Sequence, residues 1–350
     1  MKSKEVYVEI QLLSKHGLSL RQIAAEVGCA VNTVAAAHGK KPLPAIDDDD
    51  APEQKETKIS PVDPDAGYMV RDGKPTGFFY LDHRTVDGVH SLITDTHVTA
   101  ANVHDSGPYL GRLDRMRERF GFDVAVAGLD AGYFTPHICK GLIERDIYGV
   151  IGYRRPNHKE GYFYKREYEY DAERDGYVCP NGEFLAYRTT NLIGYREYAS
   201  QASQCSQCPS KAQCTQSRNG VKVVTRHVWQ HYKESVDANR LTDKGKELYK
   251  RRKKTVERSF ADAKELHGHR YARFRGLAKV KAQALLAAAC QNMKKMACLL
   301  ERALRLLFAS HFALHDASIA RIHRLIENVL RNAQFFTAPP RSHFAAPVQM

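Results

Sequence analysis

The chain has 350 residues, of which 43% are hydrophobic, and its formal net charge is +13. This length suits one large or two moderate domains with a buried core. The first residues lack the apolar stretch of an export signal, and the apolar run around LLAAACQNM is too short to span a membrane. We therefore expect a cytoplasmic protein whose eight cysteines are thiols or metal ligands rather than disulfides.

The charge is unevenly distributed along the chain. Residues 249–281 contain twelve Lys or Arg and three acids, whereas residues 47–65 contain eight acids and two lysines. A basic surface favours a polyanion, and nucleic acid is the commonest one. The charge alone is equally compatible with a solvated basic surface that binds nothing.

Residues 1–38 have the pattern of short helices. Ser19 is a suitable N-cap for the second helix, and Gly28 is a suitable residue to end it. The spacing resembles a helix-turn-helix DNA reader, although the third helix offers only Asn32 and Thr33 before a run of alanines. Residues 39–66 are acidic and rich in Pro, which predicts a mobile linker.

The region from residue 67 alternates between strand and helix patterns. GFFYLDHRTVD and HSLITDTHVTA predict a hairpin, and HDSGPYLGRLDRMRERFG predicts an amphipathic helix. DVAVAGLD and IYGVIGY predict buried strands, separated by a helix in TPHICKGLIERD. This order predicts an α/β sheet.

Residues 154–235 interrupt that order and predict an inserted β-rich module. They contain Cys179, Cys205, Cys208 and Cys214, arranged as C…C-x2-C-x5-C, which suits a structural zinc ion but also four reduced thiols. The remaining cysteines, Cys29, Cys139, Cys290 and Cys298, lie on apolar helical faces and are expected to be packing residues. Helices are predicted from Leu241 onward, with residues 301–350 as a helical tail whose end is loose.

Two acids are candidates for chemistry. Asp130 ends a predicted buried strand, where α/β sheets place their ligands, but it also suits a turn cap. Glu257 lies on a predicted helix at the border of an apolar stripe, in line with Lys253 and Lys264. It is either a partner for Lys253 or a metal-binding acid flanked by lysines that bind phosphate.

Three segments together resemble the DDE transposases of bacterial insertion sequences, over roughly residues 38–300. They are GLDAGYFTPHICKGLIERDIYGVIGYRRP, the Cys-bearing insert, and RRKKTVERSFADAKELHGHRYARFRGLAKVKAQALLAAACQNMKKMA. The resemblance implies an α/β fold in which an RNase H-like sheet is flanked by helices, with a domain at residues 67–300. It also implies three acids that hold two Mg²⁺ ions for DNA strand cleavage and transfer.

The resemblance assigns the second acid to Asp130 and the third to Glu257, and Lys264 matches the family's lysine seven positions after the third acid. The family's upstream Tyr and Arg are less clear. Lys250 and Lys253 hold those spacings, while Tyr249 and Arg252 lie one position off.

The first acid has no counterpart at its expected place. In the family it lies on a first strand that precedes a linker like AHGKKP, but here the linker at residues 37–50 follows the helix-turn-helix-like segment. We infer a junction near residues 34–37 and expect two unpaired strand edges in the sheet. Asp82, Asp87 and Asp95 are weak candidates to replace the missing acid.

The resemblance implies DNA ends and a target as partners, a homodimer and a nucleoid-associated location. Tyr271, Arg273, Phe274 and Arg275 interleave aromatic and basic groups that suit a DNA backbone, or a surface loop. One alternative is a non-enzymatic DNA-binding derivative that acts as a competitor or regulator. Another is an unstable product without function.

Overall fold

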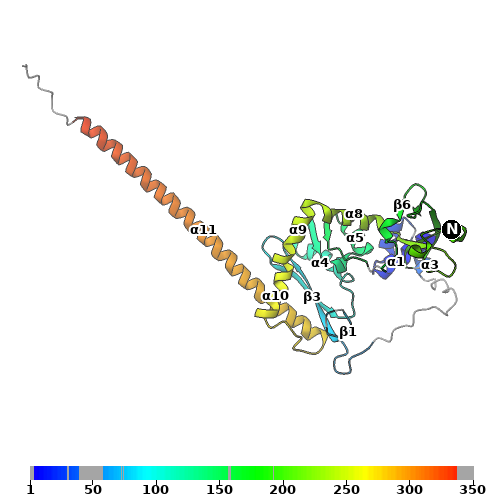
Figure 1. The fold of residues 1–350 in the computed structure, drawn as a ribbon. Coiled ribbons are helices and arrows are strands. Elements are labelled where there is room, and N and C mark those ends of the chain that lie inside the picture. The colour runs from blue at the N-terminus through cyan, green and yellow to red at the C-terminus, as the bar shows by residue number, and fades with distance from the viewer. Residues whose placement is uncertain are drawn as a thin grey trace, which may run out of the picture. The chain divides into compact units, whose positions relative to one another are not determined.

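A computed structural model describes residues 4–29, 31–38, 58–71, 73, 75–156, 159–191 and 193–336. These residues form a mixed α/β structure with three sheets (Figure 1). It divides into two compact units, Met1–Ala287 and Ala288–Met350, and each is described by itself below. Most of the predicted linker at residues 39–66 lies outside the described residues.

The N-terminal segment consists of three helices, α1 (Lys4–Lys15), α2 (Leu20–Val27) and α3 (Val31–His38). The predicted boundaries of α2 are confirmed. The Ser19 side chain accepts a hydrogen bond from the Gln22 backbone, and the Gln22 side chain accepts one from the Ser19 backbone. Gly28 ends the helix in the left-handed conformation, with φ at 62°, where glycine has no steric penalty.

These helices pack on the rest of the first unit around Trp229. Their buried apolar side chains form one cluster with it: Val8, Ile10, Leu12, Leu13, Ile23, Ala24 and Val34. The Trp229 indole donates a hydrogen bond to Glu9 at 3.2 Å, and the His16 ring stacks on His137 at 3.6 Å. Lys140, which is buried, forms ion pairs with Glu26 of α2 and with Glu144. The N-terminal segment therefore shares a core with the body.

The predicted hairpin is confirmed as an antiparallel sheet of β1 (Gly67–Met69), β2 (Gly77–Val86) and β3 (Ile93–Ala100), in that order. The short β1 pairs with the first three residues of β2, and its Gly67 also forms an antiparallel bridge with Ile59. The last residues of the predicted linker are tied to this sheet, because Asp63 accepts hydrogen bonds from the Tyr80 hydroxyl and the Gly276 backbone.

A second sheet contains β4 (Val126–Leu129) and β5 (Tyr148–Ile151), which pair in parallel. Helix α5 (Pro136–Ile143) connects them, and α4 (Tyr109–Phe120) precedes them. Their core is a cluster that includes Leu110, Leu113, Ile138, Leu142 and Ile151. Within the described residues no strand joins this sheet to β1-β2-β3. We predicted a buried strand before Asp130, but Val126 and Gly128 are exposed. Only the alternate residues of β4, Ala127 and Leu129, are buried or half-buried.

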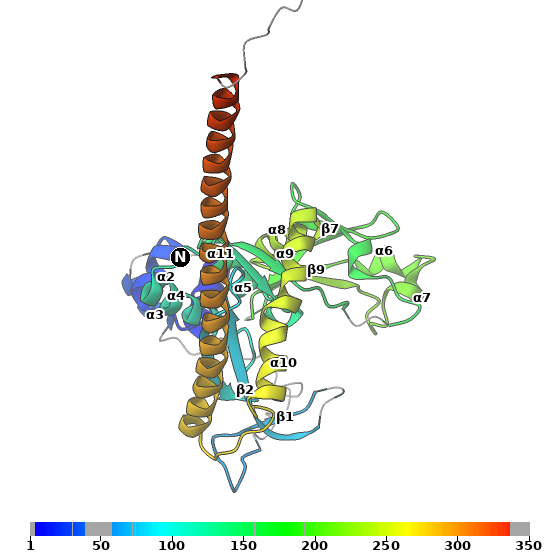
Figure 2. The ribbon, with the colours of Figure 1, turned by 90° about the vertical axis from the view of Figure 1, so that its left-hand side faces the viewer.

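The β-rich character predicted for residues 154–235 is found in a third sheet with the strand order β10-β9-β8-β7-β6. Its strands are β6 (Glu169–Asp171), β7 (Gly176–Val178), β8 (Phe184–Thr190), β9 (Tyr195–Ala199) and β10 (Val223–His227). All four pairings are antiparallel. The short helices α6 (Ala202–Ser206) and α7 (Lys211–Cys214) lie together at one end of this module (Figure 2).

Four helices follow: α8 (Gln230–Leu241), α9 (Asp243–Lys254), α10 (Val256–Leu266) and α11 (Leu277–Phe336). Ser259 and Ala263 are the fully buried residues of α10, whereas Val256 and Phe260 of the predicted apolar stripe are half-buried. The α10 helix lies against β2, where the Arg84 guanidinium donates to the Ser259 backbone and lies over the Phe260 ring. No helix among the described residues is long and apolar enough to cross a membrane.

The buried ammonium of Lys140 generates a stability prediction. Lys140→Met keeps most of the aliphatic stem but removes the charge that both Glu26 and Glu144 contact, so we expect the free energy of unfolding to fall by about 1.5–3 kcal/mol. Lys246→Met is the matched control, because its ion pair with Asp243 is exposed, and it should change that energy by less than about 0.5 kcal/mol. Denaturant titration measures both, and equal effects would refute the buried contact.

Candidate active site

Asp130 follows β4 directly and begins the 3₁₀ turn Ala131–Tyr133. Its Oδ1 atom accepts a hydrogen bond from the Ala131 backbone at 2.7 Å. The strand end is held in place by β5, because the Gly152 backbone donates to the Leu129 carbonyl. Asp130 therefore caps this turn, which is one of the two roles that its position in the sequence suits. This role leaves the carboxylate 66% exposed and available for other contacts.

Glu257 lies in the first turn of α10, and an irregular residue precedes that helix. Thr255 has φ −109° and ψ −92°, so it interrupts the helical path between α9 and α10. Its backbone donates to the carbonyls of Arg251 and Arg252, which closes α9. The break changes which side chains of α9 face Glu257. In an unbroken helix Lys253 would be the neighbour one turn before Glu257.

Arg252 brings the two acids together. Its Nη1 atom lies 3.8 Å from Asp130 Oδ1 and 3.9 Å from Glu257 Oε1. The two carboxylate oxygens can be no further apart than the sum of these distances. The arginine is only 15% exposed, and its stem packs over Gly128 of β4. The structure therefore gives Arg252, and not Lys253, the position between the acids.

Tyr249 is the second α9 residue at this site. Its hydroxyl accepts a hydrogen bond from Arg252 Nη1 at 3.1 Å. A Cβ atom at Gly152 would lie 2.5 Å from that hydroxyl and 3.0 Å from the Ala131 backbone nitrogen. Position 152 therefore requires glycine for Tyr249 to reach the turn after Asp130. Tyr249 and Arg252, whose spacing from Glu257 is one residue too long, both face the site because Thr255 interrupts the helix.

The weak candidates for a replacement acid have structural partners instead. Asp82 accepts hydrogen bonds from Arg84 and Thr96 at 2.8 Å and contacts the His269 ring at 3.0 Å. Burial raises the pKa of its carboxyl, but the His269 hydrogen bond and the Arg84 charge outweigh that and lower it. Asp87 accepts hydrogen bonds from backbone groups of the hairpin turn, and Asp95 forms an ion pair with Arg112. None of these contacts joins them to Arg252.

Asp105 is an acid near the site that sequence reasoning did not single out. Its Oδ2 atom lies 3.8 Å from the place that a Cβ on Gly132 would take, in the turn after Asp130. Burial, and then the nearby carboxylates of Asp105 and Asp130, raise the pKa of Tyr133 to about 12. Asp105 lies in the loop after β3, and the HDSG sequence around it contains no signal that distinguishes it from an ordinary loop residue.

Two neighbours of Asp105 differ in charge. Arg71 lies 3.8 Å from its carboxylate and is always charged, and His83 lies 3.9 Å away. Burial lowers the pKa of His83 to about 4, so that ring is uncharged near neutral pH. Within the described contacts, Asp105 is therefore neutralised by a single long ion pair.

The donor set at the site has the chemistry of a hard-cation site but is incomplete. Carboxylate oxygens are the ligands that Mg²⁺ prefers, and Asp130 and Glu257 supply them from two elements. However, the described part of the chain contains no group of three or more His, Cys, Asp or Glu side chains close enough to hold a metal ion. Two acids are brought together here, and a third is not.

The residues predicted to bind DNA are exposed around α10 and the loop that follows it. Lys253 and Lys264 extend into solvent, as do Arg273 and Arg275. Tyr271 and Phe274 are 76% and 51% exposed, which is unusual for aromatic side chains without a partner surface. Basic and aromatic groups are thus both accessible in this segment.

The four cysteines of the β-rich module have separate contacts and do not form a group close enough to hold a metal ion in the described structure. Asn181, in the turn after Cys179, donates a hydrogen bond to Cys208 Sγ at 2.9 Å. Cys214 Sγ lies 3.1 Å from the Tyr168 hydroxyl, and both Cys179 and Cys214 pack against the same apolar cluster. Cys205 donates to Ser200 at 3.1 Å.

The other four cysteines differ in their exposure. We predicted packing roles for all of them. Cys139 is fully buried and Cys29 is half-buried, but Cys290 and Cys298 of α11 are exposed, so that prediction was wrong for these two.

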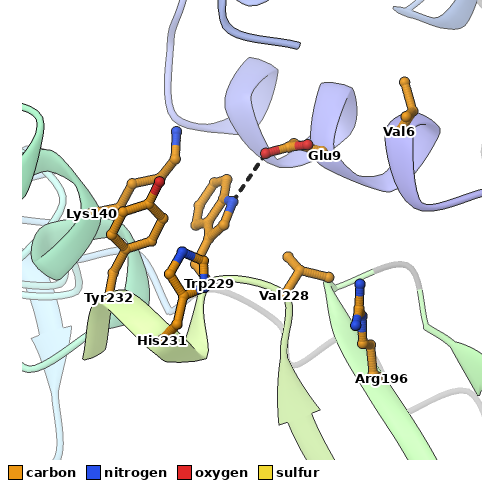
Figure 3. Close-up of a pocket in the computed structure, with 8 residues that line it drawn as sticks. All are labelled: Val6, Glu9, Lys140, Arg196, Val228, Trp229, His231 and Tyr232. Carbon is orange, nitrogen blue, oxygen red and sulfur yellow. Dashed lines mark hydrogen bonds between the residues drawn. The ribbon is translucent and has the colours of Figure 1, made fainter. Parts of the chain in front are cut away.

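A pocket of about 230 Å³ lies away from the two acids, between α1 and the start of α8 (Figure 3). Val6 and Glu9 line it from α1, and Trp229 and Tyr232 line it from the body. Its lysine, Lys140, is already neutralised by two glutamates. The pocket belongs to the contact between the N-terminal helices and the body.

The contacts of Arg252 predict how much this residue contributes to the stability of the fold. Arg252→Ala removes packing over Gly128, the hydrogen bond to Tyr249 and the shared contact with both acids, so we expect a loss of about 1–2 kcal/mol in unfolding free energy. Lys253→Ala, one residue on and exposed, should change it by less than about 0.5 kcal/mol. Thermal and urea unfolding compare the pair. A larger loss for Lys253→Ala would contradict the arrangement at Thr255.

Comparison with known proteins gives one match. Residues 178–297 match the family model described as the transposase DDE domain. The matched range covers about a third of the chain, contains Glu257, Lys264 and the four module cysteines, and begins after Asp130. No curated protein and no solved structure matches the chain. Residues 178–297 are thus similar to the DDE domain of transposases.

Proposed function

We propose that this protein is a DDE transposase that binds DNA at the ends of an insertion sequence and cleaves and transfers DNA strands at the site of Asp130 and Glu257. One observation carries the proposal. Acids from a strand end and from a distant helix both lie within 4 Å of the same guanidinium nitrogen. The carboxyl end of a strand is where α/β sheets place their ligands, and carboxylates there suit the metal ions of phosphoryl transfer.

Asp130 and Glu257 are the residues that would hold Mg²⁺. When bound, a pair of Mg²⁺ ions would stabilise the attacking and leaving oxygens of the phosphodiester. The distances to Arg252 bring one carboxylate oxygen of each acid close enough for both residues to hold the same metal centre.

The protein's own residues supply positioning and charge. Arg252 neutralises the repulsion between the two acids in the described arrangement and fixes their directions through its buried stem. Lys264, exposed on α10 two turns after Glu257, can contact a phosphate as a point charge. The Tyr249 hydroxyl lies against Gly152 and borders the site. These groups orient a DNA strand over the end of β4.

The residue that would serve as the third acid of the proposed site is still to be assigned. Asp105 suits that position better than Asp82, Asp87 or Asp95, because it lies beside the turn after Asp130 and, among the described contacts, pairs with one charged side chain, Arg71, at 3.8 Å. Asp82, in contrast, would have to give up contacts with three side chains.

Cleavage of DNA that carries both ends of the element tests the proposed activity. With Mg²⁺ we expect strand cleavage by the natural protein and a loss of more than about 100-fold for Asp130→Asn and Glu257→Gln, because each carboxylate supports several kcal/mol of charge stabilisation. Glu265→Gln on the same helix is the control and should retain activity, since Glu265 pairs only with Arg270 in the described contacts. Asp105→Asn shows whether that residue is the third acid.

The outcomes distinguish an active transposase from the alternative interpretations of this chain. Equal cleavage by all variants would place the chemistry elsewhere. Salt-sensitive DNA binding without any cleavage would leave a DNA-binding derivative of a transposase. An unfolding curve without a cooperative transition would indicate an unstable product.

The exposed basic and aromatic segment supports a DNA surface around α10. We expect binding to weaken steeply with salt, and the combined change Lys264→Gln, Arg273→Gln and Arg275→Gln to reduce the slope of log K against log salt by about 1 for each phosphate that the protein no longer neutralises. Fluorescence anisotropy at several salt concentrations measures the slope. The control removes exposed cations of the β-rich module, Arg166→Gln, Arg188→Gln and Arg218→Gln, and should leave it unchanged. If the natural protein, the triple variant and the control have equal slopes, these three cations do not contact DNA phosphates.

We propose that the four module cysteines hold a structural zinc ion, which would draw together thiols that are too far apart in the described structure to form a metal-binding group. The contact between Asn181 and Cys208 brings the Cys179 turn to the C-x2-C loop, and the Cys214 thiol faces the same cluster as Cys179. Four thiolates are a complete ligand set for tetrahedral Zn²⁺. The ion would connect the hairpin of β7 and β8 to α6 and α7.

Zinc content tests this part of the proposal. The purified protein should contain about one Zn²⁺ per chain, and Cys205→Ser with Cys208→Ser should lose it and lower the melting temperature. Cys290→Ser with Cys298→Ser is the matched control, because these exposed thiols lie on α11. Elemental analysis gives the stoichiometry. Zinc retained by the first pair, or absent from the natural protein, would contradict the site.

A further inference from the structure

The loop between α10 and α11, residues 267–276, carries the aromatic and basic side chains of the proposed DNA surface (Figure 2). Four of its exposed residues are Tyr271, Arg273, Phe274 and Arg275. The Arg273 guanidinium lies back against Gly268, where a Cβ atom would collide with it. Since the other side chains extend into solvent, the conformation of this loop depends on the contacts of its backbone.

Both ends of the loop are fixed on the hairpin sheet. Near the end of α10, the His269 ring lies 3.0 Å from the Asp82 carboxylate of β2. At the start of α11, Val280 and Ala284 share a buried cluster with Val98 of β3. The exposed part of the loop therefore runs between two fixed points on one sheet.

The middle of the loop is held by one side chain of α11. The Gln283 amide nitrogen donates to the Tyr271 carbonyl at 2.9 Å, and the Gln283 amide oxygen accepts from the Arg273 backbone at 2.9 Å. One amide thus binds the backbone on both sides of Ala272. A hydrocarbon side chain of similar size would make neither bond.

The end of the loop is held by two acids from a segment more than 200 residues earlier in the chain. Asp63 accepts from the Gly276 backbone at 3.2 Å, and Asp65 accepts from the Leu277 backbone at 2.8 Å. Backbone N–H groups at the start of a helix have no partner within the helix, so these carboxylates satisfy two of them. The same charges repel DNA phosphates, which makes them unfavourable neighbours for a DNA surface unless they hold its shape.

We infer that Gln283, Asp63 and Asp65 are positioning residues for DNA binding, which fix the loop in its binding conformation before DNA arrives. The inference rests on the proposed function, which names side chains that touch DNA but not the groups that orient them. Ordering a mobile loop on association costs binding free energy for each immobilised side chain. A loop that is already ordered in the folded protein spares DNA binding that cost.

A matched pair of double variants separates the hydrogen bonds of the acids from their charge. Asp63→Ala with Asp65→Ala removes both, whereas Asp63→Asn with Asp65→Asn removes the same two charges and keeps an oxygen that can accept. By fluorescence anisotropy with a labelled duplex of mixed sequence, we expect the alanine pair to bind at least about fivefold more weakly than the asparagine pair. The asparagine pair should bind as tightly as the natural protein or more tightly, because repulsion is lost.

Gln283→Leu tests the other contact without changing any charge or the linker acids, and it decides the result if the alanine pair does not fold. Leucine is a good helix former, so α11 should persist. We expect weaker DNA binding with the natural slope of log K against log salt, because every cation remains. In the free protein, hydrogen exchange of residues 271–277 should be faster in the leucine variant and the alanine pair but not in the asparagine pair.

Equal DNA affinities for the alanine and asparagine pairs would overturn the inference, because the effect would then belong to charge. Natural affinity and natural loop exchange in Gln283→Leu would overturn it as well. A natural protein that does not bind the duplex would refute both this inference and the proposed function. The expected pattern of binding in a protein that cleaves no DNA would count against the proposed cleavage alone.

Discussion

The guanidinium of Arg252 is the constraint on which the candidate site depends. It lies between a carboxylate at the end of a parallel strand and a carboxylate on a helix far along the chain. A long cationic side chain with a buried stem can hold two acids that would otherwise repel each other. Glycines make the approach feasible, since Arg252 packs over Gly128 and Tyr249 packs over Gly152. The site is thus formed where β4 and β5 meet α9.

The surroundings of the site explain both its accessibility and its incompleteness. The hairpin sheet and the sheet of β4 and β5 are not joined by a strand in the described chain, and β4 is exposed on alternate residues. Unpaired strand edges are normally covered or paired in stable proteins. The N-terminal helices do not fill this place, because they pack around Trp229 in another part of the first unit. The acid pair therefore borders an open edge instead of a continuous sheet.

Local elements were predictable from sequence because their signals are local. Ser19 and Gly28 bound α2, and Thr135 with Pro136 begins α5, as capping chemistry requires. The identity of the cation between the acids was not predictable, because helical spacing favours Lys253 and only the break at Thr255 turns Arg252 to the site. The position of Asp105 depends on how a loop after β3 meets the turn after β4, and no sequence pattern encodes that long-range contact.

Iron-mediated cleavage of the backbone tests the convergence of the two acids most directly. Fe²⁺ that replaces Mg²⁺ generates hydroxyl radicals with peroxide and ascorbate, and these cut the chain close to the bound ion. The account predicts cuts both near residue 130 and near residue 257, suppressed together by excess Mg²⁺ and abolished together in Asp130→Asn. Cuts near only one of these positions, or only among the cysteines of residues 179–214, would contradict a shared metal site.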